Sequence, residues 1–294
     1  MSLDLEPGFL NRLERVAIVA RKTLKGLGHG ARRSKRSGGA VEFADYRRYT
    51  PGDDPRQIDW YAYARFEALF VKLFMAEQDL QVHLICDHSA SMRTGSPPKL
   101  PFAWHVLLAL AYVGLAAGDR VQLNLFADAG PHAKLGPLQG RRGLARLIGF
   151  LKAQPEPSAA TDLGRAIRGF LARRPAPGVA LVISDFLDPQ GFREPLERLR
   201  YSGFEPHVIH VVSPDEVDPR LGPDVELVDV ETGETHVLAL DRVSLAAYKA
   251  RFQGFCAELQ ALCAKHEIGY ARARSDTAPE AFVLETLRRS SVVG

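Results

Sequence analysis

The sequence contains little cysteine, and this limits the compartments in which we expect to find the protein. Three cysteines occur in 294 residues, and none lies in a CxxC pair. Cys256 and Cys263 are seven residues apart in a helical pattern, which separates them by about 10 Å along the helix axis. That distance is too long for a disulfide bond. Scattered thiols are typical of a reducing compartment, so we expect a cytoplasmic protein.

Long hydrophobic runs and a secretion signal are also missing. The best candidate for a membrane span, residues 106–117, contains only 12 residues. A membrane-spanning helix needs about 20 apolar residues. The first residues show no basic segment followed by an apolar one. We therefore expect no membrane span, and residues 106–117 read as a core helix.

No excess of one charge is present, since the net charge is +3. Such a balance does not by itself indicate a nucleic-acid partner. A local basic arm does occur, consisting of Arg21, Lys22, Lys25, Arg32, Arg33, Lys35, Arg36, Arg47 and Arg48. Charged runs of this kind are usually solvated, and no DNA-binding or RNA-binding motif accompanies this one. Nucleic-acid binding through the arm therefore stays open only as an alternative.

The motifs of common ATPases and hydrolases are absent. There is no Walker A loop, no GxSxG elbow and no HExxH pair. A phosphatase of the haloacid dehalogenase kind needs a second aspartate two residues after its nucleophile, and Ser89 stands there after Asp87. The glycine-rich residues 26–30 follow a helical pattern rather than a strand, so they indicate a helix end rather than a dinucleotide loop. We therefore expect a protein that is not an enzyme.

Short apolar runs alternate with helical patterns from residue 80 onward. Strands are expected at 82–86, 121–126, 179–184, 207–212 and 268–271, helices at 102–117, 143–151, 163–171, 192–199 and 243–266, a hairpin at 225–240, and a last helix ending near 287. This alternation predicts an α/β fold with a doubly wound, mostly parallel sheet that is covered on both faces.

The N-terminal part has a different pattern. Apolar residues at helical spacing predict a helix over residues 9–25, and residues 31–68 are polar and irregular. Residues 69–75 alternate like a strand. We expect a leader of helix, basic loop and strand over residues 1–76, packed on a main domain formed by residues 77–294.

Oxygen-bearing side chains occur where open α/β sheets bind their ligands, beyond the carboxyl ends of the strands. Asp87, Ser89 and Ser91 follow one strand and are two residues apart, so in an extended segment they point the same way. Asp185 follows another strand, and Thr161 precedes a helix. Each hydroxyl alone could be a helix cap. The joint pattern instead predicts a metal site.

A site made only of oxygen ligands suits a hard divalent cation, Mg²⁺ first and Mn²⁺ or Ca²⁺ next. Asp87 and Asp185 only just neutralise such an ion, because the hydroxyls are neutral donors. The ion then has room for one more anionic ligand. A glutamate or aspartate of a partner protein would serve, and no small-molecule substrate is expected.

The pattern resembles the metal-ion-dependent adhesion site of von Willebrand factor A domains. Asp87, Ser89 and Ser91 match its DxSxS element. Thr161 matches its loop threonine, and Asp185 matches its second aspartate. The resemblance therefore implies an intact metal site in a von Willebrand factor A-like, Rossmann-like fold.

Nearly the whole chain also resembles the bacterial domain-of-unknown-function 58 family, whose members join a leader to a von Willebrand factor A-like domain. The segment RYTPGDDPRQIDW at residues 48–60 carries the resemblance, supported by residues 32–34, 118–121 and 229–233. Ser275 departs from the family, which more often has threonine before the aspartate. This position is far in sequence from the metal motif.

The segment at residues 48–60 also has a physical interpretation. Asp53, Asp54 and Arg56 can pair locally around the turn at residues 51–52. Asp59 can reach Arg65, and Trp60 is expected to pack. A structural clamp is favoured over catalysis, and a partner surface is the functional alternative.

The family resemblance implies an adaptor role. Members are typically encoded beside MoxR-type AAA+ ATPases, so the metal site is expected to capture an acidic residue of the ATPase or its client. Chaperone-like remodelling or maturation of a protein complex would follow. The enzyme alternative is a metal-dependent hydrolase in which His88 acts as a base beside a metal-bound water.

Overall fold

The computed structural model describes ten segments of the chain, with gaps between them. They are residues 5–18, 43–51, 53–74, 79–127, 133–157, 160–219, 224–228, 235–239, 242–289 and 292–293. The chain divides into a main unit, Met1–Lys22 with Leu80–Gly294, and a small unit, Thr23–Asp79. Phe9 and Leu13, near the start of the chain, are buried in the main hydrophobic core.

A six-stranded sheet forms the centre of the main unit, with the order β10-β7-β6-β3-β4-β5. The strands are β3 (Gln81–Asp87), β4 (Arg120–Phe126), β5 (Lys134–Leu138), β6 (Val179–Ser184), β7 (Glu205–Val212) and β10 (Gly269–Arg274). All neighbours pair in parallel except β4 and β5. The prediction of an α/β fold with a mostly parallel sheet is therefore confirmed. Strand β5 was not expected, since its sequence KLGPL lacks apolar alternation and contains glycine and proline.

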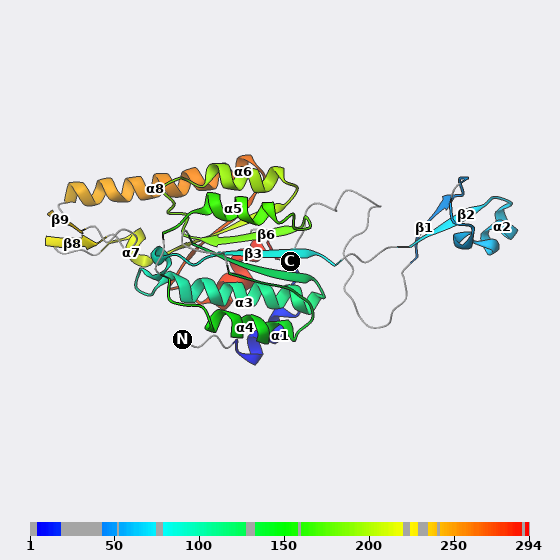
Figure 1. Cartoon of the computed structure of the whole chain (residues 1–294), viewed down its shortest axis with the longest axis horizontal. Helices are drawn as coiled ribbons and strands as arrows, with labels where there is room; N and C mark the ends of the chain where they lie inside the picture. The colour runs from blue at the N-terminus through cyan, green and yellow to red at the C-terminus, as the bar shows by residue number, and fades with distance from the viewer. Residues whose placement is uncertain are drawn as a thin grey trace. The chain divides into compact units, whose positions relative to one another are not determined.

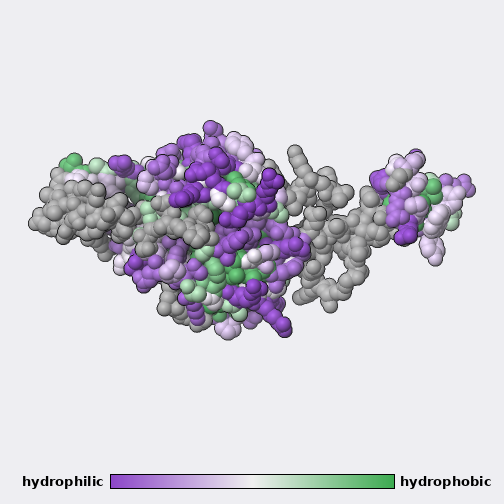
Figure 2. All heavy atoms as spheres, in the orientation of Figure 1, coloured by the Kyte–Doolittle hydropathy of each residue, from purple (hydrophilic) through white to green (hydrophobic). Residues whose placement is uncertain are grey.

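Helices cover both faces of this sheet (Figure 1). One layer holds α1 (Pro7–Leu13), α3 (Lys99–Ala117) and α4 (Gly143–Lys152); the other holds α5 (Leu163–Ala172), α6 (Arg193–Tyr201) and α8 (Arg242–Lys265). A separate hydrophobic cluster lies on each side of the sheet. The outer surface of α5 and α6, at the top of the view, is largely hydrophilic (Figure 2). This arrangement explains the two-sided burial of β6, all of whose residues are buried.

Helix α3 is apolar around its whole circumference because it is a central helix of its layer. By length and composition it could cross a membrane, but 78% of its apolar window is buried inside the fold. The sheet lies on one side of it, and α1 and α4 pack on the other. Its burial agrees with the prediction of a core helix at residues 102–117.

The remaining described elements of the main unit are short. They are η2 (Ala90–Arg93), α7 (Pro214–Val217), β8 (Asp224–Val228), β9 (Thr235–Ala239), α9 (Pro279–Ala281), the π-helical η3 (Phe282–Thr286) and α10 (Leu287–Arg289). β8 and β9 pair antiparallel, as the predicted hairpin requires. The turn of that hairpin lies outside the described residues.

The predicted helix at residues 9–25 is wrong in its extent. Helix α1 ends at Leu13, and Ile18 instead forms an antiparallel bridge with Val293. Ile18 is fully buried, so pairing with the C-terminal residues satisfies its backbone within the core. Residues 19–25, the glycine-rich residues 26–30 and the basic arm up to Arg36 lie outside the described residues.

The small unit contains more regular structure than the sequence suggested. Its elements are β1 (Phe43–Arg48), η1 (Pro55–Gln57), α2 (Trp60–Phe66) and β2 (Phe70–Phe74). β1 and β2 pair antiparallel. The prediction of irregular structure for residues 31–68 is therefore wrong for β1 and α2, whereas β2 confirms the predicted strand at 69–75.

Aspartates organise the turn of the small unit, and of the predicted local pairs Asp54 accepts a hydrogen bond from the Arg56 amide at 3.0 Å. Asp53 accepts hydrogen bonds from the Arg47 guanidinium at 2.7 Å and from the Thr50 amide at 2.9 Å. The Asp59 side chain accepts from two backbone amides at the start of α2, and from the Tyr46 hydroxyl at 2.7 Å. Trp60 is 61% exposed, so the prediction that it packs is wrong. Its neighbour Asp59 is the buried residue of this segment.

Candidate functional site

The order of the strands reverses between β3 and β6. From β3 the chain continues to β4 and β5 on one side, and it later adds β6, β7 and β10 on the other. Ligands of open α/β sheets bind beyond the carboxyl ends of the strands at such a switch point. Asp87 is the last residue of β3, and Asp185 directly follows β6. The sheet therefore brings both predicted aspartates to its switch point.

Asp87 is fully buried and held by two hydrogen bonds. Its Oδ1 accepts from the Ser89 amide at 3.0 Å, and its Oδ2 accepts from the Ser184 hydroxyl at 2.6 Å. Burial, together with the negative charge of Asp185, raises the pKa of Asp87 to about 7 even though these hydrogen bonds oppose the shift. The raised pKa reflects the burial of Asp87 and its closeness to a second carboxylate.

Ser89 and Ser91 are both buried, and their hydroxyl oxygens lie 3.0 Å apart. Ser89 has an extended backbone and precedes η2 without capping it through its side chain, so the interpretation of Ser89 as a helix cap is wrong. Two neighbouring ligands of an octahedral Mg²⁺ are also separated by about 3 Å, because each lies about 2.1 Å from the ion at a right angle. The spacing of the two hydroxyls therefore fits a shared hard cation.

Asp185 lies on a tight turn. Its Oδ1 accepts from the Leu187 amide at 3.1 Å, and its Oδ2 accepts from the Lys99 ammonium at 2.6 Å. Phe186 has a positive φ of 58°, which is unusual for a bulky residue, and its amide donates to the Ser184 hydroxyl at 2.9 Å. Backbone strain of this kind persists where the surrounding structure holds it. The turn fixes the direction of the Asp185 carboxylate.

The two aspartates have opposite pKa shifts. Burial alone would raise the pKa of Asp185, but the charge of Lys99 and hydrogen bonds from Lys99, Leu187 and Ser91 hold it below its ordinary value. Asp185 is thus the ionised member of the pair, and Asp87 is the member whose charge is opposed.

Thr161 is buried in the loop before α5. The cap of that helix is Asp162, which accepts from the Arg165 amide at 2.6 Å, so the cap interpretation does not apply to Thr161. Asp188, in the loop after β6, accepts from the Leu163 amide at 2.7 Å. This bond ties the loop that carries Thr161 to the loop that carries Asp185.

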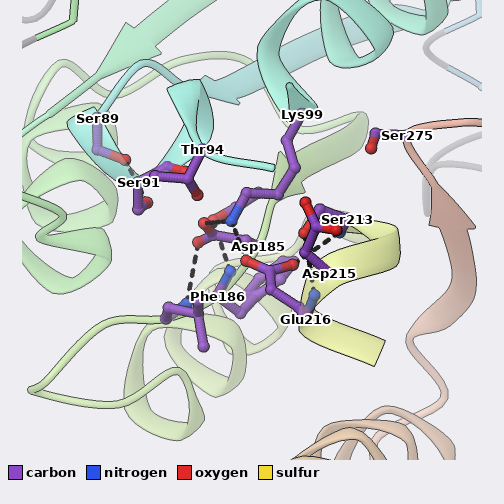
Figure 3. A network of polar contacts seen from close by, with 12 residues as sticks. Ser89, Ser91, Thr94, Lys99, Asp185, Phe186, Ser213, Asp215, Glu216 and Ser275 are labelled. Atoms are coloured by element: carbon purple, nitrogen blue, oxygen red, sulfur yellow. Dashed lines mark hydrogen bonds and ion pairs between the residues drawn. The ribbon is translucent and has the colours of Figure 1, made fainter. Parts of the chain in front are cut away.

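Sequence reasoning missed three residues of this region: Ser184, Lys99 and Glu216. Lys99 is fully buried at the start of α3, and its ammonium lies 2.6 Å from Asp185 and 2.5 Å from Glu216. Figure 3 shows its side chain reaching Asp185, with Glu216 beside it. A signal for Lys99 was present, because a lysine in the first turn of a helix opposes the helix dipole. Such a residue needs a negatively charged partner.

The predicted donor set consists of oxygens, and three of its members, Ser89, Ser91 and Thr161, are hydroxyls. Among the described residues no group of three or more histidine, cysteine, aspartate and glutamate side chains could hold a metal. Any metal site here therefore depends on Ser89 and Ser91 as well as on the carboxylates. His88 stacks on Trp104, with ring centres 5.7 Å apart, and burial lowers its pKa. It is neutral at pH 7.

Comparisons with known proteins give a family and distant neighbours. The family model described as "Protein of unknown function DUF58" matches residues 45–258. Uncharacterised proteins of Mycobacterium bovis and Mycobacterium tuberculosis are 28% identical over 241 residues, covering 80% of this chain and 75% of theirs. The conserved hypothetical protein BatB of Bacteroides thetaiotaomicron is 17% identical, with a TM-score of 0.44, over 72% of this chain and 98% of its own. An aerotolerance-related membrane protein of Bacteroides fragilis is 20% identical, with a TM-score of 0.44, over 71% and 99%.

Proposed function

Because the chain belongs to the family described as "Protein of unknown function DUF58", we propose that its main unit is a von Willebrand factor A-like domain that binds a protein partner through a divalent cation. The observation that carries the proposal is the gathering of Asp87, Ser89, Ser91 and Asp185 at the switch point of the sheet. The uncompensated charge of Asp87 supports a cation there rather than a neutral ligand.

Each residue has a defined task in this proposal. Ser89 and Ser91 offer paired hydroxyl oxygens, Asp87 and Asp185 supply negative charge, and Thr161 adds a hydroxyl from the loop before α5. Mg²⁺ suits this set first, and Mn²⁺ or Ca²⁺ next. When bound, the cation supplies an open coordination position for a carboxylate of the partner. Asp87 and Asp185 are both held by backbone amides, which fix the two carboxylates that would hold the ion.

The partner in this proposal is a MoxR-type AAA+ ATPase or its client, and the role is that of an adaptor in remodelling or maturation of a protein complex. The family resemblance supplies this partner, and the acidic chemistry of its contact follows from the site. A cytoplasmic location is part of the same proposal, and cell fractionation tests it.

A binding experiment tests the proposal. The full chain is immobilised and offered a purified MoxR-type AAA+ ATPase from the same organism, in Mg²⁺ or in chelator. Capture in Mg²⁺ and its loss in chelator or with Asp87→Ala are expected. Asp276→Ala is the matched control, since it removes an exposed carboxylate that pairs only locally with Arg274. Equal capture by wild type in Mg²⁺ and in chelator would refute metal-dependent docking.

Two parallel assays test the alternative functions, which are metal-dependent hydrolysis and nucleic-acid binding. Turnover of a phosphoester or a peptide by the chain alone, lost in Asp87→Ala, would replace the adaptor by a metal-dependent hydrolase. Nucleic-acid binding that survives physiological salt would favour the basic arm instead, because simple phosphate contacts weaken steeply with salt. The substitutions for that assay neutralise Arg32, Arg33, Lys35 and Arg36.

A further inference from the structure

Lys99 is an unusual residue for its surroundings. It begins α3, its side chain is fully buried, and the helix dipole at that end disfavours a positive charge. Burial of an ammonium costs several kcal/mol unless its partners are well placed. The ion pairs with Asp185 and Glu216 supply those partners. A fixed positive charge therefore lies beside the proposed metal site.

Glu216 is held in place independently of Lys99. Its Oε2 accepts from the Ser213 amide at 2.7 Å, and its own amide donates to the Ser213 hydroxyl at 3.2 Å. This capping box lies at the N-terminus of α7, which begins directly after β7. Asp215, the residue before Glu216, accepts a hydrogen bond at 2.8 Å from the amide of Ser96, which lies in the loop before α3. Figure 3 shows Ser213, Asp215 and Glu216 together on α7, beside Lys99.

The net charge of the side chains around the proposed site can be compared with the charge of a divalent cation. When all three carboxylates are ionised, Asp87, Asp185 and Glu216 contribute three negative charges, and Lys99 contributes one positive charge. The net charge of minus two matches one divalent cation. Without Lys99 the three carboxylates would carry a net charge of minus three, and they would attract a cation more strongly.

Lys99 also engages the carboxylate that a cation would use. Its ammonium donates a hydrogen bond to Oδ2 of Asp185, and the other oxygen of Asp185 already accepts from the Leu187 amide. A cation that draws on Asp185 must therefore share this carboxylate with Lys99. In the absence of the cation, the same ion pair gives the buried Asp185 carboxylate a positively charged partner.

We propose that Lys99 is an internal cation of this site: it holds Asp185 and Glu216 when no metal is bound, and it weakens the binding of a divalent ion by competing for Asp185. The inference rests on the proposed metal site and names the residue that regulates it. Lys99 is a positioning residue, because it acts through Asp185.

The test compares full-length Lys99→Met and Glu216→Gln with wild type. Mg²⁺ affinity is measured by calorimetry, and thermal unfolding is followed in chelator and in Mg²⁺. Lys99→Met should bind Mg²⁺ at least tenfold more tightly, unfold at lower temperature in chelator, and recover with Mg²⁺. Glu216→Gln should bind Mg²⁺ more weakly, since Lys99 then pairs with Asp185 alone, while glutamine still completes the capping box.

Lys249→Met is the matched control, because it removes an exposed lysine that pairs with Asp218 at the end of α7. It should leave Mg²⁺ affinity unchanged. A purely structural role for Lys99 predicts weaker Mg²⁺ binding and no recovery by Mg²⁺ in Lys99→Met, together with unchanged Mg²⁺ affinity in Glu216→Gln, and either result would overturn the inference. If Lys99→Met does not fold even in Mg²⁺, Glu216→Gln decides: weaker binding supports the inference, and unchanged or tighter binding overturns it. No Mg²⁺ binding by any of the proteins refutes the proposed metal site itself.

Discussion

Replacing Asp87 by asparagine tests whether the charge of Asp87 is left uncompensated when no metal is bound. Asparagine keeps the shape of the side chain and an oxygen that can accept from the Ser89 amide. Its neutral amide removes both the burial of a charge and the repulsion by Asp185, which together raise the pKa of Asp87. The variant therefore separates the charge of Asp87 from its packing.

The magnitude follows from the pKa. The folded protein raises the pKa of Asp87 from 3.8 to about 7, which corresponds to about 4 kcal/mol of stability. Because the folded value is the higher one, this stability is fully present below pH 3.8 and is lost as the pH rises through about 7. About 2 kcal/mol of the loss should fall between pH 5.5 and 8.

Urea unfolding in chelator at several values between pH 5.5 and 8 measures this loss. Wild type should lose about 2 kcal/mol more than Asp87→Asn across that range. Adding Mg²⁺ at pH 8 should stabilise wild type and leave Asp87→Asn nearly unchanged. Identical pH dependence of the two proteins in chelator would show that the charge of Asp87 is already compensated, and the reasoning would fail.

Other predictions concern the fold. Leu107→Ala, in the fully buried face of α3, should cost about 2–5 kcal/mol in urea unfolding without changing Mg²⁺ affinity, and a changed affinity would mean that the site depends on this packing. Gly178→Ala should destabilise by at least 1–3 kcal/mol, since its Cβ would lie 2.1 Å from the Gln81 carbonyl oxygen; wild-type stability would contradict the close pairing of β6 with β3. Burial lowers the pKa of His83 below its ordinary value, so its contribution to stability is present above about pH 6.5 and is lost as the pH falls. His83→Gln should therefore flatten the acid limb of stability measured below pH 6.5, and an unchanged limb would contradict a buried neutral His83.

Much of the main unit could be predicted because its apolar runs are unambiguous. The strand at residues 179–184 is apolar throughout since both of its faces are covered, and helix α3 is apolar around its circumference for the same reason. The extent of α1 could not be predicted, because Ile18 fits a helical spacing equally well and only the distant Val293 gives it a strand-like partner. β5 has almost no local signal, since its pairing with β4 depends on tertiary context.

The candidate site, like the fold, could be predicted from the sequence only in part. Asp87 and Asp185 could be placed together from sequence, because residues that end neighbouring parallel strands meet at one edge of the sheet. Lys99 and Glu216 could not, since they are 117 residues apart and meet through the packing of α3 against the loop after β7. Counting only Asp87 and Asp185 in the sequence gives a net charge of minus two. The structure adds Lys99 and Glu216, whose opposite charges leave that net charge unchanged.

The central claim is that Ser89 and Ser91, with Asp87 and Asp185, hold a divalent cation. The most direct measurement is an anomalous difference map from crystals of the full chain grown with Mn²⁺. We expect a peak bonded to both serine hydroxyl oxygens at about 2.0–2.6 Å, the range of hard cations. Well-ordered density for Ser89 and Ser91 without such a peak, or a peak bound only at other residues, would contradict the claim.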